Sequence, residues 1–144
     1  MAKFTPIAED GHFDMETFDT IMNVNFRAAV SLTMKCLPHL KTTKGAIVNV
    51  SSVASCRPAR GMMGYCISKT ALDGFTKALA AELAACGVRV NSVNPGPIPS
   101  NIDRDMEKAA YSPKDRSLET VAPSLEYLHI GLSDESSMTI LPAD

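Results

Sequence analysis

The chain has 144 residues, 45% hydrophobic and 21% charged, which predicts one globular domain rather than a disordered, collagen-like or coiled-coil chain. Fourteen Lys and Arg stand against sixteen Asp and Glu, for a formal net charge of −2. Because no basic excess is available to neutralise phosphates, a nucleic-acid partner is not expected. The longest Ala/Leu-rich stretch, 78–86, contains Glu82 and is too short to span a bilayer, so no membrane partner is expected either.

The cysteines and the first residues indicate a compartment. The four cysteines are widely spaced, form no C-x-x-C pair and have no histidine nearby at a spacing that suits zinc. The first residues contain no apolar segment of the kind that directs secretion. We therefore expect a cytoplasmic protein without a metal site, whose thiols are reduced and mostly buried. These cysteines are Cys36, Cys56, Cys66 and Cys86.

The first regular element is expected to be a long helix. Asp14 offers an N-cap oxygen, and apolar residues then recur at three- and four-residue steps to about Leu37, where Pro38 ends the pattern. A turn is expected at 44–45. The β-branched run Ala46–Val50 then predicts a short strand that is buried on both faces.

A second long helix is expected from about Gly64 to Cys86. Gly87 follows at the position where a left-handed C-cap is typical, and Val88–Val93 predicts a second strand. The apolar stripe of this helix consists of Leu72, Phe75, Leu79 and Leu83.

A third helix is expected from about Ser117 to Leu132, and Met138–Leu141 predicts a last strand. Helices that alternate with short buried strands indicate an α/β fold with a parallel sheet and crossover helices. In such sheets ligands bind at the carboxyl ends of the strands. The loops at 51–52 and 94–96 follow the two clear strands, so chemistry is expected there.

Tyr65 and Lys69 stand four positions apart, on one face at the start of the second predicted helix. A phenol titrates near pH ~10, and a neighbouring ammonium stabilises its phenolate form. The pair therefore suits acid–base chemistry. The spacing alone also fits an ordinary pair of side chains on a helix surface.

Ser52 gives the pair a functional context. It ends a predicted strand at the ligand-binding edge, thirteen residues before Tyr65, and its hydroxyl is suited to donate to a substrate oxygen. No G-x-S-x-G turn surrounds it and no histidine is placed as its base, which disfavours hydrolase chemistry. The alternative is a loop serine that caps nearby backbone groups.

Three linked motifs resemble the short-chain dehydrogenase/reductase family: 45–52 (GAIVNVSS), 65–72 (YCISKTAL) and 88–96 (VRVNSVNPG). Phe18-Asp19 with Val24-Asn25 resembles the family's helix that bears a fourth active-site residue, and 132–142 is similar to its C-terminal segment. Within the family, the closest resemblance is to L-xylulose (dicarbonyl) reductases and related carbonyl reductases. The resemblance implies a doubly wound Rossmann-type parallel sheet.

The resemblance also implies roles. Tyr65 is expected to be the general acid–base, Lys69 to support it and hold the nicotinamide ribose, and Ser52 to polarise the carbonyl. Asn25 is expected to hold a water that links Lys69 to solvent, although on position alone it also fits a polar residue within helix packing. The loop beside the nicotinamide corresponds to Pro95, Gly96, Ile98 and Ser100.

The family's Gly-rich turn after its first strand and its Asn-Asn-Ala-Gly segment are not found in this sequence. We therefore expect residues 1–144 to form a partial domain, the C-terminal catalytic part of the fold without its first mononucleotide-binding half. NADP(H) is expected in preference to NAD(H), and without that half we expect the chain to bind the dinucleotide weakly or not at all.

Two functions stay open within the family. The first is reduction of a carbonyl of a small sugar or dicarbonyl. The alternative is a catalytically silent fragment that acts at most as a dimerisation module, through the helices expected at 14–37 and 64–86. A homo-oligomer through these helices is expected in either case. A sugar-nucleotide epimerase also uses Tyr-x-x-x-Lys, but the Ser-Ser and Pro-Gly-x-Ile patterns disfavour it.

Overall fold

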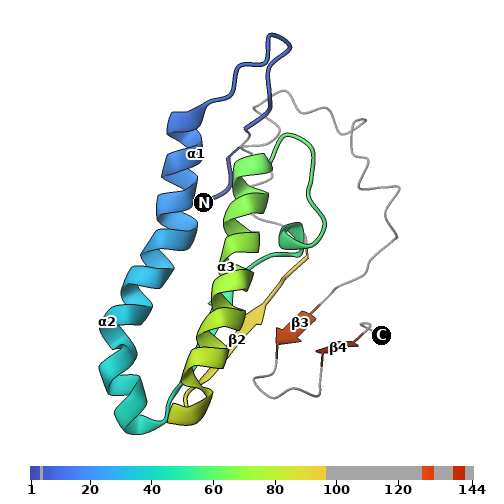
Figure 1. Cartoon of the computed structure of the whole chain (residues 1–144). Coiled ribbons are helices and arrows are strands. Elements are labelled where there is room, and N and C mark those ends of the chain that lie inside the picture. Colours follow the sequence, from blue (N-terminus) through green and yellow to red (C-terminus); the bar gives the residue numbers. More distant parts are fainter. Residues whose placement is uncertain (4, 97–127, 132–137, 142–144) are drawn as a thin grey trace.

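The computed structural model describes residues 1–3, 5–96, 128–131 and 138–141 of the chain (Figure 1). Two long helical segments lie side by side, with a parallel pair of strands packed against the second of them. The first segment comprises α1 (Met15–Met22), the π-helical turn η1 (Asn23–Arg27) and α2 (Ala28–Thr43). The second is α3 (Met63–Leu83), which ends in the 3-10 turn η3 (Ala84–Cys86).

The first helical segment begins as predicted but ends later. Asp14 caps it, since its Oδ1 accepts from the Thr17 amide at 2.9 Å. The predicted end before Pro38 is wrong, because α2 continues through this residue to Thr43. Proline removes the amide that would bond to the carbonyl of Met34. Met34 is 46% exposed and Pro38 is exposed as well, so water is available to that carbonyl.

The predicted turn at 44–45 is confirmed. Lys44 adopts the left-handed conformation with φ 50°, and the Gly45 amide donates to the carbonyl of Leu40 at 3.0 Å. A Cβ on Gly45 would stand 2.8 Å from Cδ2 of Leu40, so a larger residue here would require the end of the Leu40 side chain to shift.

The strands β1 (Ala46–Val50) and β2 (Arg89–Val93) pair in parallel, with Ala46 opposite Arg89 and Val50 opposite Val93. The parallel sheet with α3 as its crossover helix is therefore confirmed, and Gly87 takes the predicted left-handed C-cap with φ 72°. The expectation that β1 is buried on both faces is wrong. Val48 and Val50 are 60% and 61% exposed, because α3 covers the face on which the alternate residues of the strand lie.

The core lies between α3 and the sheet. The predicted stripe is confirmed, since Leu72, Leu79 and Leu83 are buried and Phe75 packs partly buried against the cluster. Phe75 also meets Phe26 edge to face, with ring centroids 6.3 Å apart, which joins the two helical segments.

The C-terminal part departs from the prediction. Residues 117–127 of the predicted third helix lie outside the described residues. The residues predicted to form the end of this helix instead form the strand β3 (Leu128–Gly131), so this part of the prediction is wrong. The predicted last strand is confirmed as β4 (Met138–Leu141), although it pairs antiparallel with β3 and does not join the parallel sheet. Short apolar segments such as 128–131 fit either periodicity, so local pattern does not separate helix from strand here.

The four cysteines are free, as predicted, but they are not mostly buried. Cys66 is buried and Cys86 half-buried, whereas Cys36 and Cys56 are exposed, because they lie on the solvent side of α2 and on the loop before α3. Within the part of the chain that the structure describes, no helix combines the length and apolar character needed to cross a bilayer.

Candidate active site

The carboxyl ends of β1 and β2 are held together beyond the last paired residues. The Ser51 amide donates to the carbonyl of Val93 at 2.8 Å, and the Val53 amide donates to the carbonyl of Pro95 at 3.0 Å. The two loops that the sequence singles out therefore meet at one edge of the sheet, where ligands bind in open parallel α/β folds.

Ser52 stands at the centre of this edge. It has an extended backbone with φ −166° and caps the 3-10 turn η2 (Val53–Ser55), because its Oγ accepts from the Ala54 amide at 3.2 Å. This hydrogen bond uses a lone pair of the hydroxyl and not its proton. Ser52 therefore caps nearby backbone, which was the alternative interpretation of this residue. The cap also orients the Ser52 hydroxyl, which still has a proton to donate.

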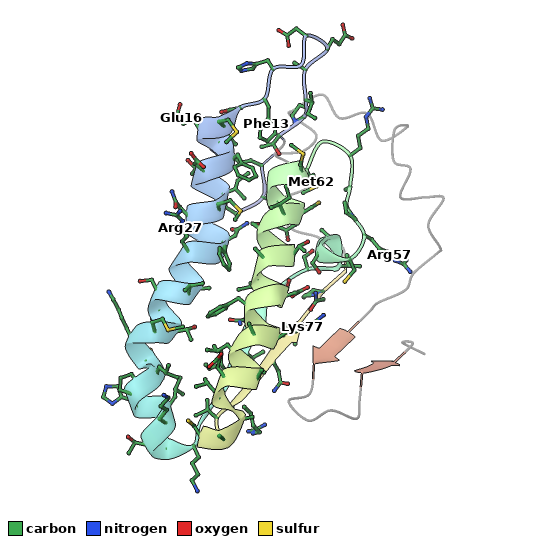
Figure 2. All side chains as sticks on the ribbon, in the orientation of Figure 1. Phe13, Glu16, Arg27, Arg57, Met62 and Lys77 are labelled. Atoms are coloured by element: carbon green, nitrogen blue, oxygen red, sulfur yellow. The ribbon has the colours of Figure 1, made fainter. Side chains whose placement is uncertain are left out.

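Hydrogen bonds fasten the Ser52 turn to α3. The Ser51 hydroxyl donates to the carbonyl of Lys69 at 3.2 Å, and the Thr70 hydroxyl donates to the carbonyl of Ser55 at 2.9 Å. The structure therefore brings Ser52 next to the helical turns that carry Tyr65 and Lys69. Figure 2 shows Met62 at the start of α3, beside the loop that carries Arg57, with Lys77 farther along the helix.

Tyr65 and Lys69 lie in the first turns of α3, as predicted. Nζ of Lys69 is 5.8 Å from the centroid of the Tyr65 ring and donates to the carbonyl of Val50 at 2.8 Å. Burial lowers the pKa of the Lys69 ammonium, and the negative charge of Asp73 opposes this shift. The ammonium thus lies over the phenol and against the strand end that leads to Ser52.

Asn25 is buried within the π-helical turn η1, a kind of irregularity that is frequent at functional sites. Its Nδ2 donates to Ser68 Oγ at 3.0 Å and to the carbonyl of Met1 at 2.7 Å, and its Oδ1 accepts from the Met1 ammonium at 2.7 Å. Ser68 donates onward to the carbonyl of Tyr65 at 2.7 Å. Asn25 is therefore joined to the Tyr65 turn, and its water-holding role stays a prediction.

The predicted nicotinamide loop is described only in its first part. The Pro95 carbonyl accepts from the Val53 amide of the Ser52 turn, and no atom of the described residues lies within 4 Å of where a Cβ on Gly96 would stand. Ile98 and Ser100 lie outside the described residues.

Sequence reasoning missed Asp73 and gave no individual role to Asn94, although it singled out the loop at 94–96. Asn94 Nδ2 donates to Asp73 Oδ2 at 2.8 Å, and Asn94 is 2% exposed. Two signals were available: Asp73 stands four positions after Lys69 on the same helix face, and Asn94 directly follows β2. Among the described residues, no group of three His, Cys, Asp or Glu side chains is placed to hold a metal.

These donors suit a carbonyl substrate and a ribose. Ser52 and Tyr65 carry hydroxyl protons, and the Lys69 ammonium keeps protons beyond the one given to Val50. These donors of the described residues fit the ribose hydroxyls at the nicotinamide end of a dinucleotide. A parallel sheet with such donors at its carboxyl edge is the arrangement expected of an α/β oxidoreductase.

The family model for short chain dehydrogenases matches residues 3–110. The chain belongs to this family of oxidoreductases, so the resemblance found in the sequence is confirmed. The fold follows, since solved members superpose on this chain over most of its length.

Three relatives illustrate the similarity. An L-xylulose reductase from Caenorhabditis elegans is 37% identical over 97 residues, which cover 66% of this chain and 39% of that protein. A short chain dehydrogenase from Burkholderia cenocepacia J2315, solved in complex with NADP, superposes with a TM-score of 0.66 at 34% sequence identity. The match covers 73% of this chain and 45% of the Burkholderia chain. An NAD+-bound xylitol dehydrogenase superposes with a TM-score of 0.67 at 26% sequence identity. This match covers 76% of this chain and 42% of the xylitol dehydrogenase chain. The chain spans less than half the length of these relatives.

Proposed function

We propose that this chain carries the active site of an NADP(H)-dependent reductase that acts on a carbonyl of a small sugar or dicarbonyl. The observation that supports it most is the attachment of the Ser52 turn to the helix that bears Tyr65 and Lys69, through Thr70 and Ser51. This attachment supports a site in which three donors from two elements act at one edge of the sheet. The similarity to an L-xylulose reductase supports the substrate class.

In this proposal Tyr65 is the acid–base. Its phenol gives a proton to the carbonyl oxygen as that oxygen gains negative charge, and takes it back in the reverse direction. The bound dinucleotide supplies the hydride. Lys69, with its ammonium over the Tyr65 ring, stabilises the negative charge left on the phenol oxygen and donates to the ribose hydroxyls.

Ser52 binds the same carbonyl oxygen from the strand end. Its hydroxyl is held by the Ala54 amide and directs its own proton to the substrate, so it polarises the carbonyl without reorganising. Asn25, bonded through Ser68 to the Tyr65 turn, holds the water through which Lys69 exchanges protons with solvent.

The nicotinamide end of the cofactor is assigned to Tyr65, Lys69 and the loop that contains Pro95, Gly96, Ile98 and Ser100. The choice of NADP(H) over NAD(H) is part of the proposal. One structural neighbour is solved with NADP and another with NAD+. A cytoplasmic location is also part of the proposal, and the free cysteines support it.

A titration of the purified chain with NADPH, followed by cofactor fluorescence, tests the proposal. Saturable binding that is weakened by Lys69→Met and unchanged by Lys77→Met is expected, since Lys77 is an exposed lysine farther along the same helix. A folded sample, verified by circular dichroism, that binds no NADPH would overturn the assignment of this chain as a working reductase.

A second candidate, an association module, has an observation in its favour. Several large apolar side chains are exposed on the helical segments, and a second copy of this chain is the partner that the family resemblance implies for them. These side chains are Met15, Val24, Leu32, Met34 and Ile67. A homo-oligomer is compatible with both candidates, because these exposed side chains lie on the helical segments and not on the Ser52 turn.

A further inference from the structure

A buried contact between an amide and a carboxylate joins α3 to the end of β2 beside the proposed site. Asn94 directly follows β2, and its Nδ2 donates to Oδ2 of Asp73 at 2.8 Å. Asp73 lies one helical turn after Lys69 on α3. Hydrogen bonds to an ionised acceptor are stronger than those between neutral groups, so this contact fixes α3 against the carboxyl end of the sheet.

The same amide reaches the turn that carries Ser52. Asn94 Nδ2 lies 2.9 Å from Ser55 Oγ and 3.2 Å from the carbonyl oxygen of Ser52. Ser55 Oγ in turn donates to the Ser52 carbonyl at 2.8 Å. One side chain therefore connects the position of Ser52 to the carboxylate of Asp73.

The burial of Asp73 and Asn94 lowers the stability of the folded chain. Oδ1 of Asp73 and Oδ1 of Asn94 are both buried and have no hydrogen-bond partner in the described part of the chain. Buried polar atoms without a partner cost free energy, and an apolar pair of similar shape avoids that cost. This favours a role beyond packing for the two residues.

Asp73 also acts on Lys69, from four positions along the helix. Among the described residues, the other titratable groups that face the Lys69 ammonium are the Met1 ammonium, which Lys69 affects electrostatically, and the Tyr65 phenol beneath it. Asp73 is the carboxylate of the described part of the chain that acts on Lys69. It opposes the effect of burial on the pKa of Lys69, so it favours the charged form of this side chain.

We propose that Asp73 is a positioning residue of the site, which holds the Ser52 turn through Asn94 and supports the charge of Lys69 one helical turn away. This inference rests on the proposed function, since that function gives Ser52 and Lys69 their tasks. Its consequence is that the donor for the substrate oxygen and the neighbouring cation are fixed by one carboxylate before substrate binds.

The electrostatic part is tested with Asp73→Asn, which keeps an acceptor oxygen for Asn94 and removes the charge. The measurement is the pKa of Lys69, from an NMR titration of protein labelled with ¹³C at the lysine ε-carbon. We expect a lower Lys69 pKa than in the wild type. The matched control is Glu82→Gln, which removes one exposed negative charge from the same helix and should leave the Lys69 pKa unchanged. Equal Lys69 pKa values in the two variants would overturn the proposal.

The geometric part is tested with Asn94→Ala, read by amide hydrogen exchange in the Ser52 turn. The amides of Ser55 and Cys56, which bond to the carbonyls of Ser52 and Val53, are expected to exchange about tenfold faster. The matched control is Asn91→Ala on the other face of β2. Its Oδ1 is also buried without a partner among the described residues, but its side chain makes no hydrogen bond to the Ser52 turn there, so these rates should not change. Unchanged protection in Asn94→Ala would contradict the proposal.

Neither measurement requires cofactor or substrate. A lowered Lys69 pKa in Asp73→Asn supports the inference even where NADPH does not bind, a result that counts against the proposed function alone. If NADPH does bind, an unchanged Lys69 pKa overturns the inference alone.

Discussion

The ammonium of Lys69 donates to the main-chain oxygen of Val50, with 2.8 Å between Nζ and O. Val50 is the last residue of β1, two positions before Ser52, and Lys69 is four positions after Tyr65. This single contact therefore joins the strand that leads to one proposed donor with the helix that carries the other. Burial of the ammonium lowers the pKa of Lys69, and the negative charge of Asp73 opposes this shift.

The depressed pKa of Lys69 makes folding stability depend on pH in a definite direction. Between the folded pKa and the ordinary value of 10.5, the unfolded chain binds more protons than the folded chain, so the free energy of unfolding contributed by this group rises with pH. We expect wild type to gain stability relative to Lys69→Met as the pH approaches 10.5, by a modest amount because the ammonium is partly solvated.

Urea unfolding of both proteins at several pH values from neutral upward measures this difference. The comparison cancels the titration of all other groups to first order. A difference that stays constant over this pH range, or that falls as the pH rises, would contradict the assignment of a desolvated ammonium at Lys69.

Gly64 allows α1 and α3 to pack closely at the start of α3. A Cβ at this position would stand 3.2 Å from Cδ1 of Ile21 and 3.3 Å from Cδ2 of Phe18. We expect Gly64→Ala to lower the free energy of unfolding by about 1–3 kcal/mol, the usual effect of overpacking. Gly74 on the same helix is exposed with no atom within 4 Å of the added Cβ, so Gly74→Ala should instead stabilise by about 0.5–1 kcal/mol. Equal effects of the two changes in urea unfolding would refute the close approach at Gly64.

The exposed apolar side chains of the helical segments predict self-association. Leu32 on α2 is 64% exposed, and a carboxylate placed there is costly to bury in an interface. In light scattering we expect a wild-type dimer and a monomeric Leu32→Glu. Val48, 60% exposed on the open face of β1, is the matched control, and Val48→Glu should stay dimeric. A monomeric wild type, or dissociation by both variants, would contradict an interface on the helices.

The sequence predicted the elements around the site because their signals are local. The Asp14 cap, the glycine at 87 and the stripe from Leu72 to Leu83 each depend on neighbours within a few residues, and each is found in the structure. The continuation of α2 through Pro38 was not predictable in this way. It depends on the solvent exposure of the preceding turn, which is a tertiary property.

In the site, too, local features were predictable from the sequence and tertiary contacts were not. Tyr65 and Lys69 share a helix face, so their spacing is visible in the sequence. Asp73 and Asn94 come together because β2 pairs with β1 while α3 crosses between them, and no local pattern reports such a contact. The exposed side of β1 was also missed, because a run of β-branched residues does not show how many faces of a strand are covered.

The proposed function requires that Ser52, Tyr65 and Lys69 form the site of a carbonyl reductase. The most direct test is NADPH consumption by the purified chain with diacetyl or L-xylulose, measured for wild type beside Tyr65→Phe. Phenylalanine keeps the ring that packs on the buried cluster of Ala54, Met62 and Cys66 and removes only the hydroxyl. We expect turnover by wild type and a loss of about 10²–10⁴-fold in the variant, with NADPH binding retained. Turnover that is equal in the two proteins, or no turnover by a wild type that binds NADPH, would contradict the account.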